Sequence, residues 1–209
     1  MKKTTLLFLT FLGLVSISNK SLNAQSTQQG NILINVYYGG PNLTASILET
    51  TFVNAGAGDE VDRINSLGPV GGRISYMIAE KVSIGVDANF TDVSISFFST
   101  SLDTTGNTNT YTTKAGWRTI RFFPRFDYHF GNSDNFDGYF GVGAGYRSRT
   151  YYSESNDPNY DGGSVEGINP ISFRLAVGGT YYLIDNLGLN LELGLGGGGL
   201  LRGGLAFKF

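Results

Sequence analysis

From residue 31 to the end of the chain, apolar and polar residues alternate with a period of two in eight segments. This period is typical of β-strands whose two faces differ in polarity. The clearest segment alternates Leu187, Leu189, Leu191, Leu193 and Leu195 with Gly188, Asn190, Glu192 and Gly194. The predicted strands are residues 31–39, 70–78, 82–91, 118–130, 139–147, 172–183, 187–195 and 201–209. We expect a bulge at Pro124, because proline cannot donate to a strand ladder.

The predicted strands have about 9 to 13 residues each, near the length of about 9 to 11 that a tilted strand needs to cross a bilayer. Short links at residues 79–81, 131–137 and 184–186 alternate with longer stretches at 40–69, 92–117 and 148–171. Short turns on one side and long loops on the other are typical of an outer-membrane barrel. The sequence therefore predicts an all-β fold, a closed antiparallel up-and-down transmembrane β-barrel of eight strands. Ten strands are the alternative, if residues 43–67 or 94–115 contain another hairpin.

The last link breaks the alternation of short and long connections, because residues 196–200 are few and lie on the long-loop side. Its glycines, Gly196 to Gly199, are not followed by the Lys-Ser pair or helix pattern of a phosphate-binding loop. We therefore interpret this link as a tight hairpin.

The polar face of the strands would point outward in a soluble barrel such as a lipocalin and inward in a membrane barrel. Its mixture of glycine, serine and alanine with cations and a few acids favours the inward arrangement, because glycine makes room for arginine in a narrow lumen and acids pair with it. We expect a salt-bridged plug in preference to a selective pore, and the excess of cations would bias any remaining pathway towards anions. The predicted lumen charge network consists of Arg73, Asp87, Arg121, Arg125, Asp127, Arg147, Arg174, Glu192, Arg202 and Lys208.

The N-terminus has the pattern of a secretory signal peptide. Lys2 and Lys3 precede an apolar run of twelve residues, Leu6 to Ile17, and the small residue Ala24 suits cleavage. The run is too short to cross a bilayer as a helix. We expect cleavage after Ala24, leaving a single barrel domain over residues 25–209.

Composition narrows the partners and cofactors of the mature chain. Cleavage would remove three of the 15 basic residues and none of the 17 acidic ones, leaving a net charge of −5, which does not suit nucleic acid. There is no cysteine for a disulfide framework or a lipid anchor. Charged residues make up 15% of the chain, against about 25% in soluble domains. No cofactor is expected.

The C-terminus carries a short motif that supports the prediction of an outer-membrane β-barrel. Arg202, Gly204, Phe207 and Phe209 fill the defined positions of the terminal assembly signal of outer-membrane barrels, which reads polar, any, glycine, any, any, hydrophobic, any, aromatic. With this motif the chain, from residue 31 onward, resembles the small porin-like outer-membrane β-barrels of Gram-negative cells, the eight-stranded type. The resemblance implies outer-membrane lipid and the outer-membrane insertion machinery as partners, with Phe207 and Phe209 recognised during assembly.

Two further patterns could indicate a catalytic site or a metal site. His129 is the only histidine, with Asp127 on the same face, but it lies beside a short turn and we identified no serine placed to complete a triad. Asp157, Asn159 and Asp161, followed by Gly162, resemble the first half of a calcium loop, but Ile168 stands where a bidentate glutamate belongs. We therefore expect neither catalysis nor a metal site, and an ordinary turn at residues 157–162.

The leading functional hypothesis is a non-enzymatic outer-membrane protein that serves envelope structure or the narrow passage of small solutes. The second is a surface binding or adhesion module that uses the long outer loops, which carry several acids, on an external ligand that the sequence does not identify. The third, and least favoured, is an outer-leaflet lipid hydrolase.

Overall fold

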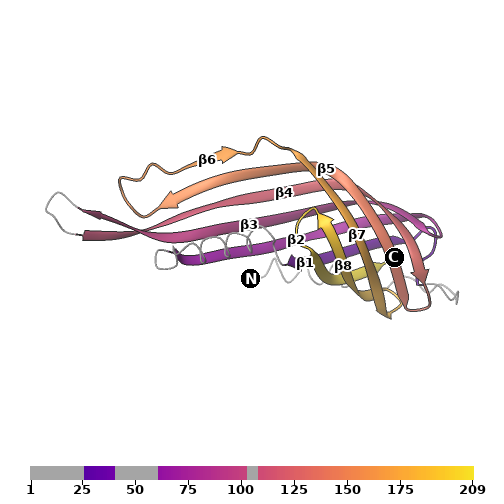
Figure 1. The fold of residues 1–209 in the computed structure, drawn as a ribbon. Coiled ribbons are helices and arrows are strands. Elements are labelled where there is room, and N and C mark those ends of the chain that lie inside the picture. Colours follow the sequence, from indigo (N-terminus) through magenta and orange to yellow (C-terminus); the bar gives the residue numbers. More distant parts are fainter. Residues whose placement is uncertain (1–25, 41–60, 103–107) are drawn as a thin grey trace, which may run out of the picture.

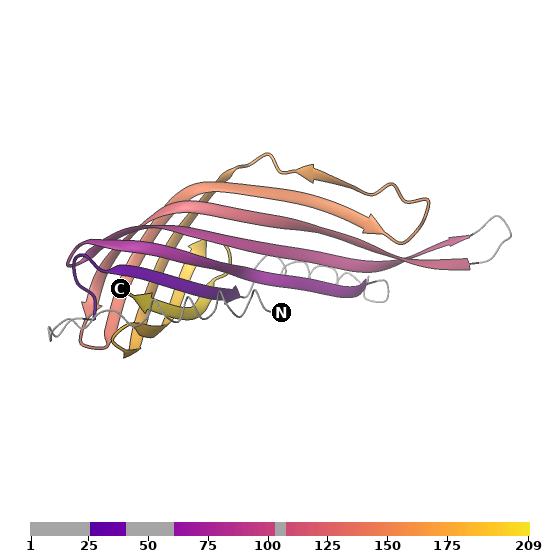
Figure 2. The same cartoon turned by 180° about the vertical axis from the view of Figure 1, so that it is seen from behind.

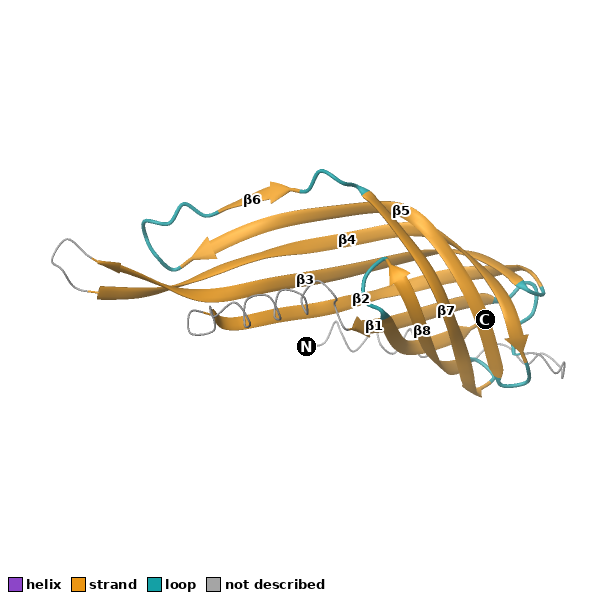
Figure 3. Cartoon of the chain, in the orientation of Figure 1, coloured by secondary structure: helices purple, strands orange, loops and turns teal. Residues whose placement is uncertain are grey.

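A computed structural model describes residues 26–40, 61–102 and 108–209, so the expected signal peptide lies outside the described residues. The described chain is built from β-strands joined by turns and loops (Figures 1 and 3). No helix in this part of the chain is long and apolar enough to cross a membrane. The strands are β1 (Ile32–Gly40), β2 (Val61–Ala79), β3 (Val82–Leu102), β4 (Thr108–Asn132), β5 (Phe136–Ser155), β6 (Gly163–Glu166), β7 (Ile171–Ile184), β8 (Leu187–Gly196) and β9 (Leu201–Lys208).

Eight of these strands close into an antiparallel barrel. The ring runs β1, β2, β3, β4, β5, β7, β8 and β9, and the pairing of β9 with β1 closes it. The short strand β6 stands outside the ring and pairs only with β5 among the described strands. The predicted fold class, a closed barrel of eight strands, is confirmed. Closure matters because an open edge would leave backbone N–H and C=O groups unpaired in hydrocarbon.

The barrel is inside-out compared with a soluble protein. In β8 the leucines from Leu189 to Leu195 are exposed, while the alternate residues Gly188, Asn190 and Glu192 are buried. The same pattern holds in β7, where Phe173, Leu175 and Val177 point outward. An outward apolar face is the surface that a bilayer requires, since lipid and not water covers it.

Four strands continue far beyond the barrel as an open outer sheet. Figures 1 and 2 show β2, β3, β4 and β5 projecting past the ends of β1, β7, β8 and β9. The β3–β4 ladder runs unbroken from Val82 opposite Tyr128 to Leu102 opposite Thr108. The expectation of a loop was therefore wrong at residues 92–102 and 108–117, and so was the assignment of 61–69 and 148–155 to loops. Residues 61–67, 94–102 and 108–115 extend existing strands and add none to the barrel, while residues 43–60 and 103–107 lie outside the described residues.

The outer sheet was not predicted because polar and apolar residues exchange faces relative to the membrane segment of the same strands. The polar residues Asp92 and Ser94 stand at positions that face lipid lower on β3, and the apolar Val93 stands at a lumen-side position. Val93 and Ser94 are both buried. Once the strands leave lipid, their outward face can be polar. The period of two persists, but its phase no longer matches that of the membrane segment.

The predicted bulge at Pro124 is also wrong. Pro124 pairs with Val86 in unbroken register on β3, and towards β5 the register is the same on both sides of it, at Phe122 and Arg125. The missing N–H interrupts the β4–β5 pairing without adding a residue to either strand. The shift in this ladder lies instead between His129 and Gly131.

Candidate functional site

The centre of the lumen is filled by interlocked charges. Seven of the ten predicted network residues meet here, and all seven are buried: Arg73, Asp87, Arg125, Asp127, Arg174, Glu192 and Arg202. They come from six strands of the ring, β2, β3, β4, β7, β8 and β9. The network thus ties together strands that are not neighbours in the barrel.

Glu192 on β8 is the hub of this network. Its Oε2 accepts from Arg125 Nη2 at 2.6 Å and from Arg73 Nη1 at 3.0 Å, and its Oε1 accepts from Arg174 Nε at 2.7 Å. The Tyr139 hydroxyl donates to the same carboxylate at 3.1 Å. One acid therefore serves three guanidinium groups, and hydrogen bonds offset the cost of taking these charges out of water.

The two aspartates complete the plug. Arg202 Nη1 donates to Asp87 Oδ2 at 2.9 Å, and the Tyr37 hydroxyl donates to the other oxygen of Asp87. Arg125 Nε donates to Asp127 Oδ1 at 2.7 Å. The lumen is thereby crossed by ion pairs from several directions.

Glycine makes space for this packing, as the sequence predicts. A Cβ at Gly194 would lie 2.8 Å from Arg174 Cζ, too close without a shift of that buried guanidinium. The long arginines fit because such lumen-facing positions carry no side chain.

The hairpin between β8 and β9 closes the outer end of the network. Gly196, Gly197 and Gly198 all have positive φ, of 75°, 60° and 111°, which L side chains adopt with strain. The turn brings the Gly197 carbonyl to Arg202 Nη2, and the Gly196 carbonyl accepts from Arg174 Nη1 at 2.8 Å. The glycine tract therefore forms the expected hairpin, and its backbone oxygens serve as further acceptors for the plug.

The other three predicted network residues lie elsewhere. Arg121 and Arg147 stand at the outer end of the lumen face, and neither has a carboxylate within ion-pair distance among the described residues. Lys208 lies at the short-turn end, where its Nζ donates to the Ser26 carbonyl at 2.6 Å.

A cluster at the short-turn end contradicts one conclusion from the sequence. His129 Nδ1 lies 2.8 Å from Asp137 Oδ1, and its Nε2 lies 3.1 Å from Ser83 Oγ. Ser83 therefore lies within hydrogen-bonding distance of His129, and the acid partner of the histidine is Asp137 and not Asp127. The three residues are at most 2% exposed. The cluster therefore has the connectivity of a Ser-His-Asp triad without access for a substrate. We interpret it as a satisfied polar contact within the barrel wall.

The calcium candidate forms a turn. Asp157 Oδ1 accepts from the backbone N–H of Asn159 at 2.9 Å, and the Asp157 carbonyl accepts from Tyr160 N at 3.1 Å. This is an Asx turn, the ordinary use of such residues. Within the described residues no group of three acidic, histidine or cysteine side chains is placed to hold a metal ion.

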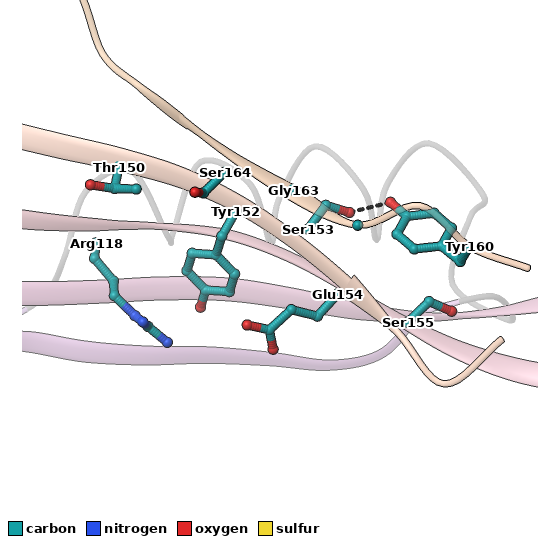
Figure 4. Close-up of a pocket in the computed structure, with 10 residues that line it drawn as sticks. Arg118, Thr150, Tyr152, Ser153, Glu154, Ser155, Tyr160, Gly163 and Ser164 are labelled. Carbon is teal, nitrogen blue, oxygen red and sulfur yellow. Dashed lines mark hydrogen bonds between the residues drawn. The ribbon is translucent and has the colours of Figure 1, made fainter. Parts of the chain in front are cut away.

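The outer sheet carries a polar cleft of about 540 Å³. Figure 4 shows Arg118, Tyr152, Glu154 and Tyr160 around it, on β4, β5 and the segment before β6. Arg118 Nε and the Tyr152 hydroxyl both donate to Asp92, each at 2.9 Å, and the Arg118 guanidinium lies 4.7 Å from the centre of the Tyr152 ring.

This cleft keeps its polar character across the physiological range. The hydrogen bond to Asp92 raises the pKa of the exposed Arg118 guanidinium. Burial raises the pKa of the Tyr152 phenol, and the hydrogen bond to Asp92 adds to the effect. Arg118 therefore stays charged and Tyr152 stays a neutral donor.

The terminal motif is divided between two faces of β9. Arg202 points into the lumen, and Phe207 pairs with Ile34 on β1, next to the residues that close the barrel. Gly204 leaves room for the backbone of β1, since a Cβ there would meet Tyr37 Cα at 2.7 Å. Phe209 continues this contact through backbone hydrogen bonds with Ile32, at 2.8 and 2.9 Å.

Comparison of the sequence with protein-family models and with curated proteins found no match. Solved structures similar to this chain include the N-terminal β-barrel domain of Pseudomonas aeruginosa OprF, with 15% identity, a TM-score of 0.42, and coverage of 88% of this chain and 100% of that one. The outer membrane protein OprG from Pseudomonas aeruginosa has 13% identity and a TM-score of 0.42, covering 87% and 97%. Ail, the attachment invasion locus protein of Yersinia pestis, has 11% identity and a TM-score of 0.39, covering 87% and 99%. The assignment of the fold rests on the strand pairing and polarity of this chain itself: it is a closed, eight-stranded β-barrel of the outer-membrane type.

Proposed function

We propose that this protein is a non-enzymatic outer-membrane barrel that acts as a non-conducting anchor for an external binding surface, the outer sheet. The observation that carries this proposal is the contrast between the two parts of the same strands. Inside the barrel they are locked by ion pairs centred on Glu192. Beyond it, β3 and β4 continue in paired register as far as Leu102 and Thr108. A sealed lumen leaves the projecting sheet as the part of the molecule that meets other molecules.

The proposed orientation puts the outer sheet outside a Gram-negative cell. It assumes that the chain is exported by its N-terminal signal, cleaved after Ala24, and inserted by the outer-membrane assembly machinery through the terminal strand with Phe207 and Phe209. In barrels of this kind the short turns face the periplasm and the long connections face outward.

A planar-bilayer recording tests whether the anchor conducts. We expect purified protein to leave the bilayer silent at physiological salt. Regular single-channel steps would contradict the proposal and favour narrow passage, the second candidate function. That candidate is supported by the uncompensated arginines at the outer end of the lumen, which would attract small anions.

A truncation tests the binding surface. Residues 95–115 can be replaced by a two-residue turn that joins Ser94 to Gly116, which are opposite each other in the ladder. Wild type and truncated protein are then compared on arrays of glycans and matrix proteins, with Glu80→Gln in a short turn as the control. We expect binding to require the outer sheet, and equal binding by the truncated protein would refute that role.

A further inference from the structure

Three arginines stand together at the outer end of the lumen face. Arg121 on β4 lies directly opposite Arg147 on β5, and Thr119 lies opposite Arg149 in the same ladder. Arg121, Arg147 and Arg149 therefore lie on the same face of the sheet, and Arg147 and Arg149 are two positions apart along β5. Like charges directly opposite each other destabilise a sheet, so this arrangement calls for a compensating charge.

No such charge is supplied by the described residues. Arg121 is only 9% exposed, and its Nη1 donates to Asn89 Oδ1 at 3.3 Å and Thr91 Oγ1 at 3.1 Å. Arg147 donates through Nε and Nη2 to the Asn169 carbonyl at 3.2 and 2.9 Å. Both guanidinium groups thus have neutral oxygen partners in the described chain.

Arg149 also donates to a neutral oxygen in the described chain. Its Nε donates to Thr119 Oγ1 at 3.3 Å, and its guanidinium lies 6.0 Å from the ring centres of Trp117 and Tyr151. The residue opposite Arg121 on β5 is the cation Arg147, and the next residue of β5 on that face is the cation Arg149. The four arginines of the plug, by contrast, each contact a carboxylate.

The chemistry of the missing partner follows from these donors. Guanidinium groups bind phosphate and carboxylate oxygens through pairs of parallel N–H bonds, and such charge-assisted bonds are about twice as strong as neutral ones. A buried arginine with only neutral partners is costly, and a bound oxyanion would remove both that cost and the repulsion between Arg121 and Arg147. The site lies on the lumen face and not on the lipid face, so a soluble molecule reaches it more directly than a membrane headgroup.

We propose that Arg121, Arg147 and Arg149 form a binding site for a phosphate or sulfate group of a soluble molecule that enters from the outer end of the barrel. This inference deepens the proposed function and rests on it, because it names the chemical class of an external ligand. The polar hydroxyls of Thr91 and Thr119, already in contact with two of the arginines, line the same face.

Isothermal titration calorimetry on the mature protein in non-ionic detergent tests the proposal, with inorganic phosphate and sulfate as probes and chloride at equal ionic strength as the reference. We expect saturable binding of phosphate or sulfate but not of chloride. Arg121→Gln and Arg147→Gln should each weaken it about tenfold or more, the loss of one charge-assisted contact. Arg118→Gln is the matched control, because Arg118 lies on the same strand but on the opposite face, paired with Asp92.

Thermal unfolding supplies a second readout that does not depend on Arg121→Gln folding. Without phosphate, Arg147→Gln should unfold at a higher temperature than wild type, because a repulsive pair is removed. With saturating phosphate the order should reverse. Absence of saturable binding in the wild type, or equal losses in Arg118→Gln and Arg121→Gln, would overturn the proposal.

The outcomes separate this inference from the proposed function. Single-channel conductance combined with phosphate binding would refute the sealed anchor but keep the anion site. A silent bilayer without anion binding would do the opposite. Binding that appears only when anionic phospholipid is added to the micelles would assign the site to a lipid headgroup and refute the soluble ligand.

Discussion

Neutralising Glu192 should destabilise the barrel far more than neutralising an exposed acid. The side chain is 3% exposed and receives hydrogen bonds from three arginines at 2.6 to 3.0 Å. In Glu192→Gln the shape is kept, but Arg174 loses its only carboxylate contact among the described residues. Breaking a buried ion pair from one side costs about 3–5 kcal/mol. We expect a loss of about 3 kcal/mol, the lower end of that range, because glutamine keeps one acceptor oxygen.

Urea unfolding in detergent micelles measures this loss. The fluorescence of Trp117, the single tryptophan, reports the outer part of β4, and the shift in gel mobility on unfolding reports the barrel. The denaturant slope should stay constant if only stability changes. Glu80→Gln, an exposed acid in a short turn, is the control and should change the free energy of unfolding by less than about 0.5 kcal/mol.

A double-mutant cycle then measures the interaction energy between Arg174 and Glu192. Arg174→Gln combined with Glu192→Gln should cost less than the sum of the two single changes, by about 0.5–3 kcal/mol, because the double variant no longer holds an unpaired arginine. If Glu192→Gln behaves like Glu80→Gln, the network does not stabilise the fold and the reasoning is refuted.

Three further predictions concern other parts of the molecule. Leu191→Arg on the lipid face of β8 should lower the free energy of folding into bilayers by about 2–4 kcal/mol, whereas Ile168→Arg, in a fully exposed outer loop, should not; similar effects at both sites would argue against lipid contact at Leu191. Ser83 should not react with a fluorophosphonate probe, and His129→Ala should cost about 1–3 kcal/mol in unfolding free energy through the buried Asp137 carboxylate that it leaves unsatisfied; covalent labelling of Ser83 would reopen the hydrolase hypothesis. Replacing residues 95–115 by a short turn should leave the gel mobility shift of the folded barrel unchanged, and loss of that shift would mean that the outer sheet is needed for folding.

The membrane segments could be predicted because lipid imposes a strict rule on one face of every strand. Leu187 to Leu195 show it most plainly, and the predicted and observed bounds of that strand agree to one residue. Outside the bilayer no face of a strand has to be apolar. At residues 92–102 and 108–117 both faces of the strands mix polar and apolar side chains, so these paired strands resembled loops in the sequence.

The partners of individual side chains were beyond prediction for a different reason. Which residues meet inside a barrel depends on the stagger between strands, and local sequence does not set it. Asp127 is close to His129 in sequence, yet the turn between β4 and β5, with its register shift after His129, brings Asp137 to the imidazole instead. Arg121 and Arg174 look alike in sequence, but only Arg174 reaches Glu192.

The most direct test of the inside-out barrel is a spin-label scan of β8. The chain has no cysteine, so single cysteines can be placed from Leu187 to Leu195 and labelled without a background. In lipid bilayers we expect collision with oxygen to be high at the odd positions and low at the even ones, with water-soluble nickel excluded from the odd positions. Nickel access at Leu189, Leu191 and Leu193, with oxygen access at the positions between them, would contradict the account.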